Sequence, residues 1–136
     1  MSASDWPELL TDPGAVTDLF AAAPDLADCG LFYLHVDDRE TGVVTLGFEL
    51  DRLPDHPLPE WTEKGLNAFE MFLSFTGVSD LRIDGWTFAP KDVVALERDP
   101  DGGMRVRISG PGECVAFGAR AAGLVKAKAY LASRGE

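Results

Sequence analysis

Residues 66–86, LNAFEMFLSFTGVSDLRIDGW, constrain the fold of this chain more than any other stretch. In the first half, large apolar side chains occupy every second position: Phe69, Met71, Leu73 and Phe75. Successive side chains of a strand point to opposite faces, so this pattern predicts a strand with one strongly apolar face. After Thr76-Gly77, a second alternating run over 78–83 predicts the return strand of a hairpin. We expect this hairpin to lie in the middle of the core.

Alternating patterns predict further strands over 29–36, 43–50, 92–98, 104–109 and 114–117. In the first of these, Phe32, Leu34 and Val36 are expected on one face, and Leu31, Tyr33 and His35 on the other. Residues 43–50 are the clearest hairpin partner of this strand. The alanine-rich segment 119–132 fits a helix or a strand. We favour a helical turn near 119–123 followed by a final strand.

Helix signals are confined to the N-terminal part of the chain. Ser4-Asp5 can cap a short turn, and Asp12-Pro13 can begin a second helix that ends at Pro24. Residues 51–60 contain three prolines, which argue against a helix or a paired strand there. The prediction is a single domain over residues 1–136 in the α+β class, mainly β. It has a curved or partly rolled antiparallel sheet of seven to eight strands in hairpin order, with one or two short N-terminal helices.

The charge distribution indicates which classes of partner this chain can bind. The formal net charge is −11, which argues against nucleic acid as a partner because phosphate binding needs clustered Lys and Arg. Residues 1–81 hold 16 acidic and 3 basic residues, whereas residues 82–136 hold 7 acidic and 9 basic residues. This asymmetry suggests an acidic face for a basic partner. Solubility alone is the alternative explanation.

No apolar run is long enough to span a membrane, and the start MSASDWPELL has no secretory pattern, so we expect a cytoplasmic protein. The two cysteines, Cys29 and Cys114, lack metal-ligand spacing and are expected to be buried thiols. A cross-strand disulfide is the alternative, and it is disfavoured in a reducing compartment.

No motif for catalysis stands out. His35 and Asp37 could form a base and its orienting carboxylate, but no motif places a nucleophile beside them. The acidic run 37–40 lacks the ligand spacing of a calcium loop, and the glycines lack the context of a phosphate loop. We therefore expect no enzyme activity, cofactor or metal.

Several segments together resemble a known family. An N-terminal tryptophan and leucine turn precedes Asp12-Pro13, and later segments read GFELDRLPDHP, FTGVSDLRIDGW and GPGECVAFGARAAGLVKAKAY. Over about residues 6–130 the chain resembles the immunity protein 50 family of bacterial polymorphic toxin systems. The resemblance implies a non-enzymatic protein that binds a cognate toxin domain and blocks its active site or substrate access. It carries no catalytic residues over to this chain.

If the toxin is a basic nuclease, an acidic face would speed association and mimic a phosphate backbone. The expected partner surface combines the first hairpin turn with the proline loop: Asp37, Asp38, Glu40, Asp51, Asp55, Glu60, Trp61 and Glu63. Trp61 is either an exposed anchor with an acidic rim or a side chain that packs the proline loop onto the body. A sheet face with Glu49 and Glu70 is the second candidate surface.

Two other functions stay open from the residues alone. One is a β-rich accessory or interaction domain unrelated to toxins. The other is a small enzyme or ligand-binding barrel, which would need a large apolar pocket with convergent polar groups. The sequence does not predict an oligomeric state.

Overall fold

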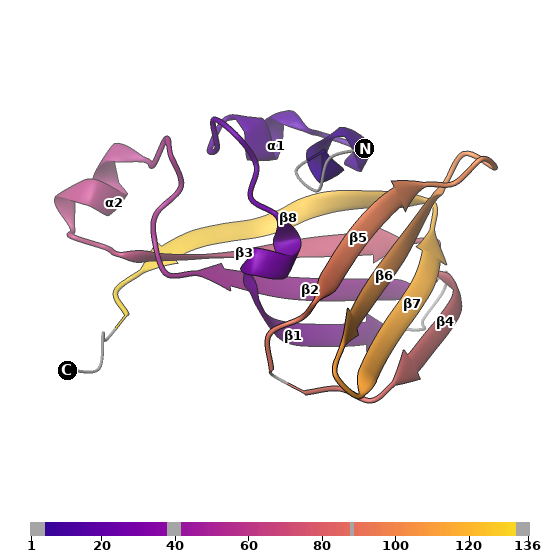
Figure 1. Ribbon diagram of the computed structural model, residues 1–136. Helices are drawn as coiled ribbons and strands as arrows, with labels where there is room; N and C mark the ends of the chain where they lie inside the picture. The colour runs from indigo at the N-terminus through magenta and orange to yellow at the C-terminus, as the bar shows by residue number, and fades with distance from the viewer. Residues whose placement is uncertain (1–4, 38–41, 88, 133–136) are drawn as a thin grey trace.

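The computed structural model describes residues 5–37, 42–87 and 89–132. Within these residues, eight strands form two four-stranded antiparallel sheets that lie against each other (Figure 1). The first sheet has the order β1 (Gly30–Asp37), β2 (Val43–Leu50), β3 (Ala68–Thr76) and β8 (Ala121–Tyr130). The second sheet has the order β4 (Ser79–Asp84), β7 (Glu113–Ala119), β6 (Met104–Gly110) and β5 (Val93–Arg98). The predicted mainly β fold is confirmed.

The inner faces of the two sheets form one hydrophobic core. The alternating residues of β3, from Phe69 to Phe75, are all buried, as the sequence predicted. On β2, Leu46 and Phe48 pair with Leu73 and Met71 of β3, so the buried faces coincide. The Phe75 ring meets the Phe117 ring of β7 edge to face, with 5.3 Å between centroids. Burying each of these side chains contributes roughly 1.5–3 kcal/mol, which makes the contact between sheets the main source of stability.

The predicted hairpin between residues 69–75 and 78–83 is wrong. β4 leaves the first sheet and pairs with β7 in the second sheet. The chain crosses between sheets twice at the same corner, after β3 and after β7, and the Arg120 amide donates a hydrogen bond to the Thr76 carbonyl there. Gly77 has a φ of +62°, and the Arg120 side chain packs on it where a Cβ would lie. β4 is an exposed edge strand, so its apolar residues add little to the core.

The last segment is a strand, as favoured, but the expected helical turn near 119–123 is wrong. Ala119 is the last residue of β7, and Ala121 is the first residue of β8. β8 pairs with β3 along its whole length. Pairing with the apolar strand β3 overrides the helix propensity of its alanines, because it satisfies the backbone while burying Ala122.

The helical segments are short: η1 (Trp6–Leu9), α1 (Gly14–Thr17), η2 (Leu26–Asp28) and α2 (Pro59–Glu63). The second predicted helix does begin near Pro13, but it ends well before Pro24, and its N-cap is Pro13 rather than Asp12. The Leu19 carbonyl accepts a hydrogen bond from the His56 amide, so the proline loop uses a backbone group that a longer helix would need.

The proline loop itself ends in α2, which the three prolines had argued against. Pro59 stands at the start of this helix, where its missing N–H costs no hydrogen bond. The N-terminal segment closes one side of the sandwich (Figure 1). There η1 and η2 lie against β5, and the Thr11 amide donates to the Ala122 carbonyl of β8. Among the described residues, no helix is long and apolar enough to cross a membrane.

Candidate functional site

The structure divides the predicted acidic surface into two parts. Asp37 is the last residue of β1, at the end of the first sheet where the chain turns into β2. Asp38 and Glu40 lie outside the described residues. The other predicted residues follow the far end of β2 (Figure 1). β2 has 8 residues, so the two parts are separated by about 23 Å, at ~3.3 Å per residue.

The far end of the first sheet carries a groove that we call the acidic groove. Four carboxylates line it: Asp25, Asp28, Glu49 and Asp51. They come from the segment around η2 and from the end of β2. The Glu49 side chain lies over Gly30 of β1, where an added Cβ would come within 3.0 Å of it. The fold therefore concentrates negative charge from segments that are distant in the sequence.

Only one cationic side chain is among the residues that line the acidic groove. Arg52 lies 3.8 Å from Asp55, which is one of the predicted residues. Asp55 also accepts a hydrogen bond from the Ala21 amide at 2.9 Å, so it joins the proline loop to the N-terminal segment. Arg52 is thus engaged beside the groove, and the four groove carboxylates outnumber it.

The remaining predicted residues lie on α2. Glu60 and Glu63 are exposed there. Trp61 is half-buried, and its ring packs against Phe69 with 5.7 Å between centroids. This contact agrees with the packing role considered for Trp61, and its role as an anchor for a partner stays a prediction. Trp61 holds α2, with its two exposed glutamates, against the core.

Of the residues examined for chemistry, His35 lies on β1, Cys29 just before β1 and Cys114 on β7. His35 is exposed and stacks on Tyr33, and among the described residues no group of three or more His, Cys, Asp or Glu could hold a metal ion. Cys29 is buried, as predicted, and Cys114 is half-buried; neither forms a disulfide. Burial, with a smaller contribution from Asp28, raises the pKa of Cys29 to about 12. This thiol is therefore not a ready nucleophile.

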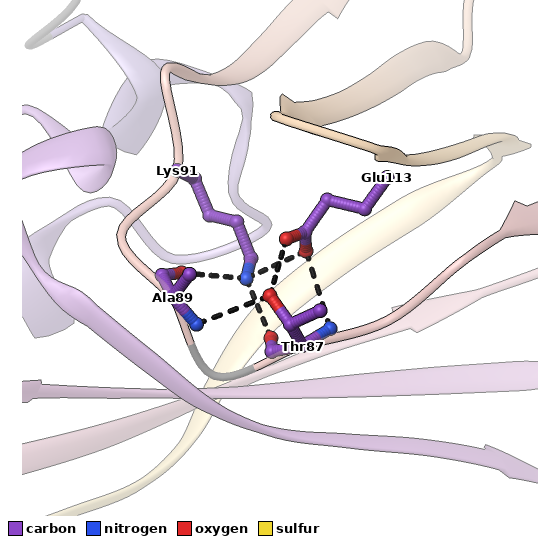
Figure 2. Close-up of polar contacts among 4 residues, drawn as sticks. All are labelled: Thr87, Ala89, Lys91 and Glu113. Atoms are coloured by element: carbon purple, nitrogen blue, oxygen red, sulfur yellow. Dashed lines mark hydrogen bonds and ion pairs between the residues drawn. The ribbon is translucent and has the colours of Figure 1, made fainter.

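A buried ion pair is the feature that the sequence did not predict. Lys91 Nζ lies 2.7 Å from Glu113 Oε1, and both side chains are nearly inaccessible to water (Figure 2). Lys91 also donates hydrogen bonds to the carbonyls of Thr87 and Ala89, and Thr87 donates its hydroxyl to Glu113. The Lys91 ammonium lies 5.1 Å from the centre of the Trp86 ring.

This network has a structural role. It joins the loop between β4 and β5 to the start of β7. The Glu113 carboxylate accepts hydrogen bonds from the Thr87 amide and hydroxyl and forms the ion pair with Lys91 of that loop. The alternating patterns of the neighbouring strands do not predict this ion pair, because Lys91 and Glu113 are far apart in the sequence. Figure 2 shows the polar groups of Thr87, Ala89, Lys91 and Glu113 directed toward one another.

Comparison with known proteins agrees with the family resemblance. A family model described as immunity protein 50 matches residues 12–130. Searches of curated proteins and of solved structures found no match. The family match begins just before α1 and runs to the last residue of β8, so it includes both sheets. The chain therefore belongs to the immunity protein 50 family.

Proposed function

We propose that this protein binds and neutralises a cognate toxin domain of a bacterial polymorphic toxin system. The observation that carries the proposal is the family match over residues 12–130. An immunity protein acts by occupying a surface of its toxin, which needs a binding face and no reactive group.

The acidic groove and α2 together form the proposed contact surface. Four carboxylates line the groove, α2 carries the exposed Glu60 and Glu63, and the net charge of the protein is −11. Such a surface attracts a basic partner and raises the association rate, most strongly at low salt. A toxin domain with a basic active-site face, such as a nuclease, fits this charge. The carboxylates would then occupy the place of substrate phosphates.

Asp37 belongs to this surface only if the toxin is large enough to reach both ends of the first sheet. The distance of about 23 Å is within the span of a standard protein–protein interface, which buries ~800 Å² on each partner. We therefore assign the main electrostatic contact to the acidic groove and treat the end of β1 as a peripheral contact.

The experiment measures binding and protection with charge reversals. The toxin domain encoded beside this gene in the producing bacterium is mixed with wild-type protein or with the double variant Asp28→Lys/Asp51→Lys. The matched control is Asp84→Lys/Asp92→Lys, which changes the net charge by the same amount. Asp84 is an exposed residue of β4, and Asp92 is an exposed residue just before β5. We expect slower association and weaker protection for the groove variant only.

Two outcomes contradict parts of the proposal. If wild-type protein neither binds nor protects against the toxin domain, the immunity function is wrong, and an accessory domain unrelated to toxins becomes the better explanation. If both double variants slow association equally, the effect comes from net charge and the assignment to the acidic groove fails.

A further inference from the structure

The outer face of the first sheet carries aromatic side chains that the core does not use. Tyr33, Gly47, Phe72 and Lys126 lie opposite one another on the four adjacent strands, so their side chains share this face. The rings of Tyr33 and Phe72 meet above Gly47, with 5.5 Å between centroids. A Cβ at Gly47 would lie 2.8 Å from the Phe72 ring, so the missing side chain makes room for both rings.

Two β-bulges bring further apolar side chains to this row. The register between β1 and β2 shifts between Leu31 and Tyr33, which leaves Phe32 as the extra residue. The sequence pattern placed Phe32 opposite Tyr33, but that prediction is wrong: both rings contact Phe72, Phe32 at 5.7 Å. We call Phe32, Tyr33 and Phe72 the aromatic row. Bulges of this kind often redirect a side chain toward a functional surface.

The second bulge lies on the other side of the aromatic row. The register between β3 and β8 shifts after Phe72, and Val125 is the extra residue of β8. Val125 is 61% exposed, and with Tyr33, Thr45, Phe72 and Lys126 it lines a shallow hollow. In the aromatic row Tyr33 is exposed and Phe32 and Phe72 are half-buried, and the row ends in a depression that an apolar side chain of a partner can enter.

The neighbouring row of the same face connects the aromatic row to the acidic groove. Gly30, Glu49, Glu70 and Lys128 lie opposite one another, and Lys128 pairs with Glu70 at 3.2 Å. Glu49 is exposed and also lines the acidic groove. An aromatic centre with a charged border is the usual anatomy of a binding hot spot.

We propose that the aromatic row is the apolar anchor for the toxin domain, and that the toxin contributes an apolar protrusion flanked by Lys or Arg. This inference rests on the proposed function and names the part of the surface that determines the lifetime of the complex. A second copy of this chain fits less well, because each copy carries a net charge of −11 and its own acidic groove at the border of the row.

The two parts of the surface have different kinetic roles. Charge at the acidic groove acts on association, whereas truncating a buried aromatic anchor acts on dissociation. Replacing a hot-spot aromatic residue weakens binding by roughly 30-fold or more. We expect this loss of affinity for Phe72→Thr and for Tyr33→Ala. It should come almost entirely from a higher dissociation rate, and that rate should depend little on salt.

The test compares dissociation rates from the immobilised toxin domain. Wild-type protein, Tyr33→Ala, Phe72→Thr and the control Ile83→Ala are measured at low and high salt. Ile83 is an exposed apolar residue of β4 on the second sheet, and it is 44% exposed compared with 40% for Tyr33. Circular dichroism and urea unfolding show whether each variant is folded, and Tyr33→Ala, at an exposed position, tests the anchor even if Phe72→Thr is unstable.

Faster dissociation of both aromatic-row variants, with the control unchanged, supports the inference. If wild-type protein binds the toxin and the folded aromatic-row variants dissociate as slowly as wild-type protein, the assignment of the aromatic row as the anchor is wrong. The proposed immunity function is not affected by that result. If wild-type protein binds no toxin domain, the proposed function fails and the anchor fails with it. Sedimentation of the protein alone completes the test: a dimer that the aromatic-row variants convert to monomers would show that a second copy occupies this face.

Discussion

Lys91 Nζ and Glu113 Oε1 lie 2.7 Å apart, in an ion pair whose side chains are only 1% and 2% exposed. Lys91 comes just before β5, and Glu113 is the first residue of β7. The pair fixes the loop that carries Trp86 and Thr87 to the second sheet. Removing one charge from a pair withdrawn from water in this way destabilises the fold, because the other charge is left buried without its partner.

The first prediction is a double-variant comparison of this pair. Lys91→Met or Glu113→Leu alone leaves the other charge buried without its partner, so each single variant is expected to lower the urea midpoint strongly. Lys91→Met/Glu113→Leu removes both charges and is expected to unfold at a higher urea concentration than either single variant. If the two single effects simply add in the double variant, the pair is not coupled and this view of the loop is wrong.

The second prediction concerns acid stability. The hydrogen bond from Lys91, followed by that from Thr87, holds the pKa of Glu113 below its ordinary value of 4.5. The ionised Glu113 carboxylate therefore contributes its full stabilisation above pH 4.5. This contribution is lost as the pH falls through the lower pKa that Glu113 has in the folded protein. Urea unfolding at a series of pH values should show stability falling in this acid range. Glu113→Gln should flatten that fall, whereas Glu97→Gln, at an exposed surface pair, should leave it unchanged.

The third prediction concerns Cys29, whose buried position raises its pKa to about 12. At pH 8, only roughly one molecule in ten thousand would carry the reactive thiolate. In a Cys114→Ser background, an alkylating reagent should therefore leave folded protein almost unlabelled and label it readily in urea. Rapid labelling of the folded protein, measured by mass spectrometry, would show that Cys29 is accessible and would contradict the burial of this thiol.

The fourth prediction compares two glycines with left-handed backbone conformations. Gly85 has a φ of +88° and Gly102 a φ of +99°. A Cβ at Gly102 would meet open space, so Gly102→Ala should cost only the conformational strain, about 1–2 kcal/mol. A Cβ at Gly85 would lie 2.6 Å from the Gly112 carbonyl oxygen, so Gly85→Ala should cost clearly more. Equal free energies of unfolding for the two variants would mean that the contact with Gly112 relaxes at no cost.

Several elements of the fold follow from local patterns. The alternation in 43–50 and 69–75 predicted two strands with buried apolar faces, and these are β2 and β3. The turn signal over residues 99–103 correctly separated two strands, since β5 ends at Arg98 and β6 begins at Met104. These predictions succeed because a side-chain period of two is a property of the strand itself and needs no knowledge of its partner.

The partners of the strands needed the tertiary structure. Thr76-Gly77 is as compatible with a hairpin turn as with a crossing between sheets, and the pairing of β4 with β7 shows the crossing. The same limit applies to Phe32, because a single bulge moved it to the face of Tyr33. A one-residue shift reverses every side chain of a strand, and the local sequence does not report it.

For the candidate site, the sequence by itself determined the family, the excess of acidic residues before residue 82 and the residues of the proline loop. The tertiary structure alone decided how the charges are grouped. It separated Asp37 from Asp51 by the length of β2 and brought Asp25 and Glu49 to the same groove. It also buried Lys91 against Glu113. The physical reason is that electrostatic interactions depend on distance and solvent exposure, and folding sets both between residues that are remote in the chain.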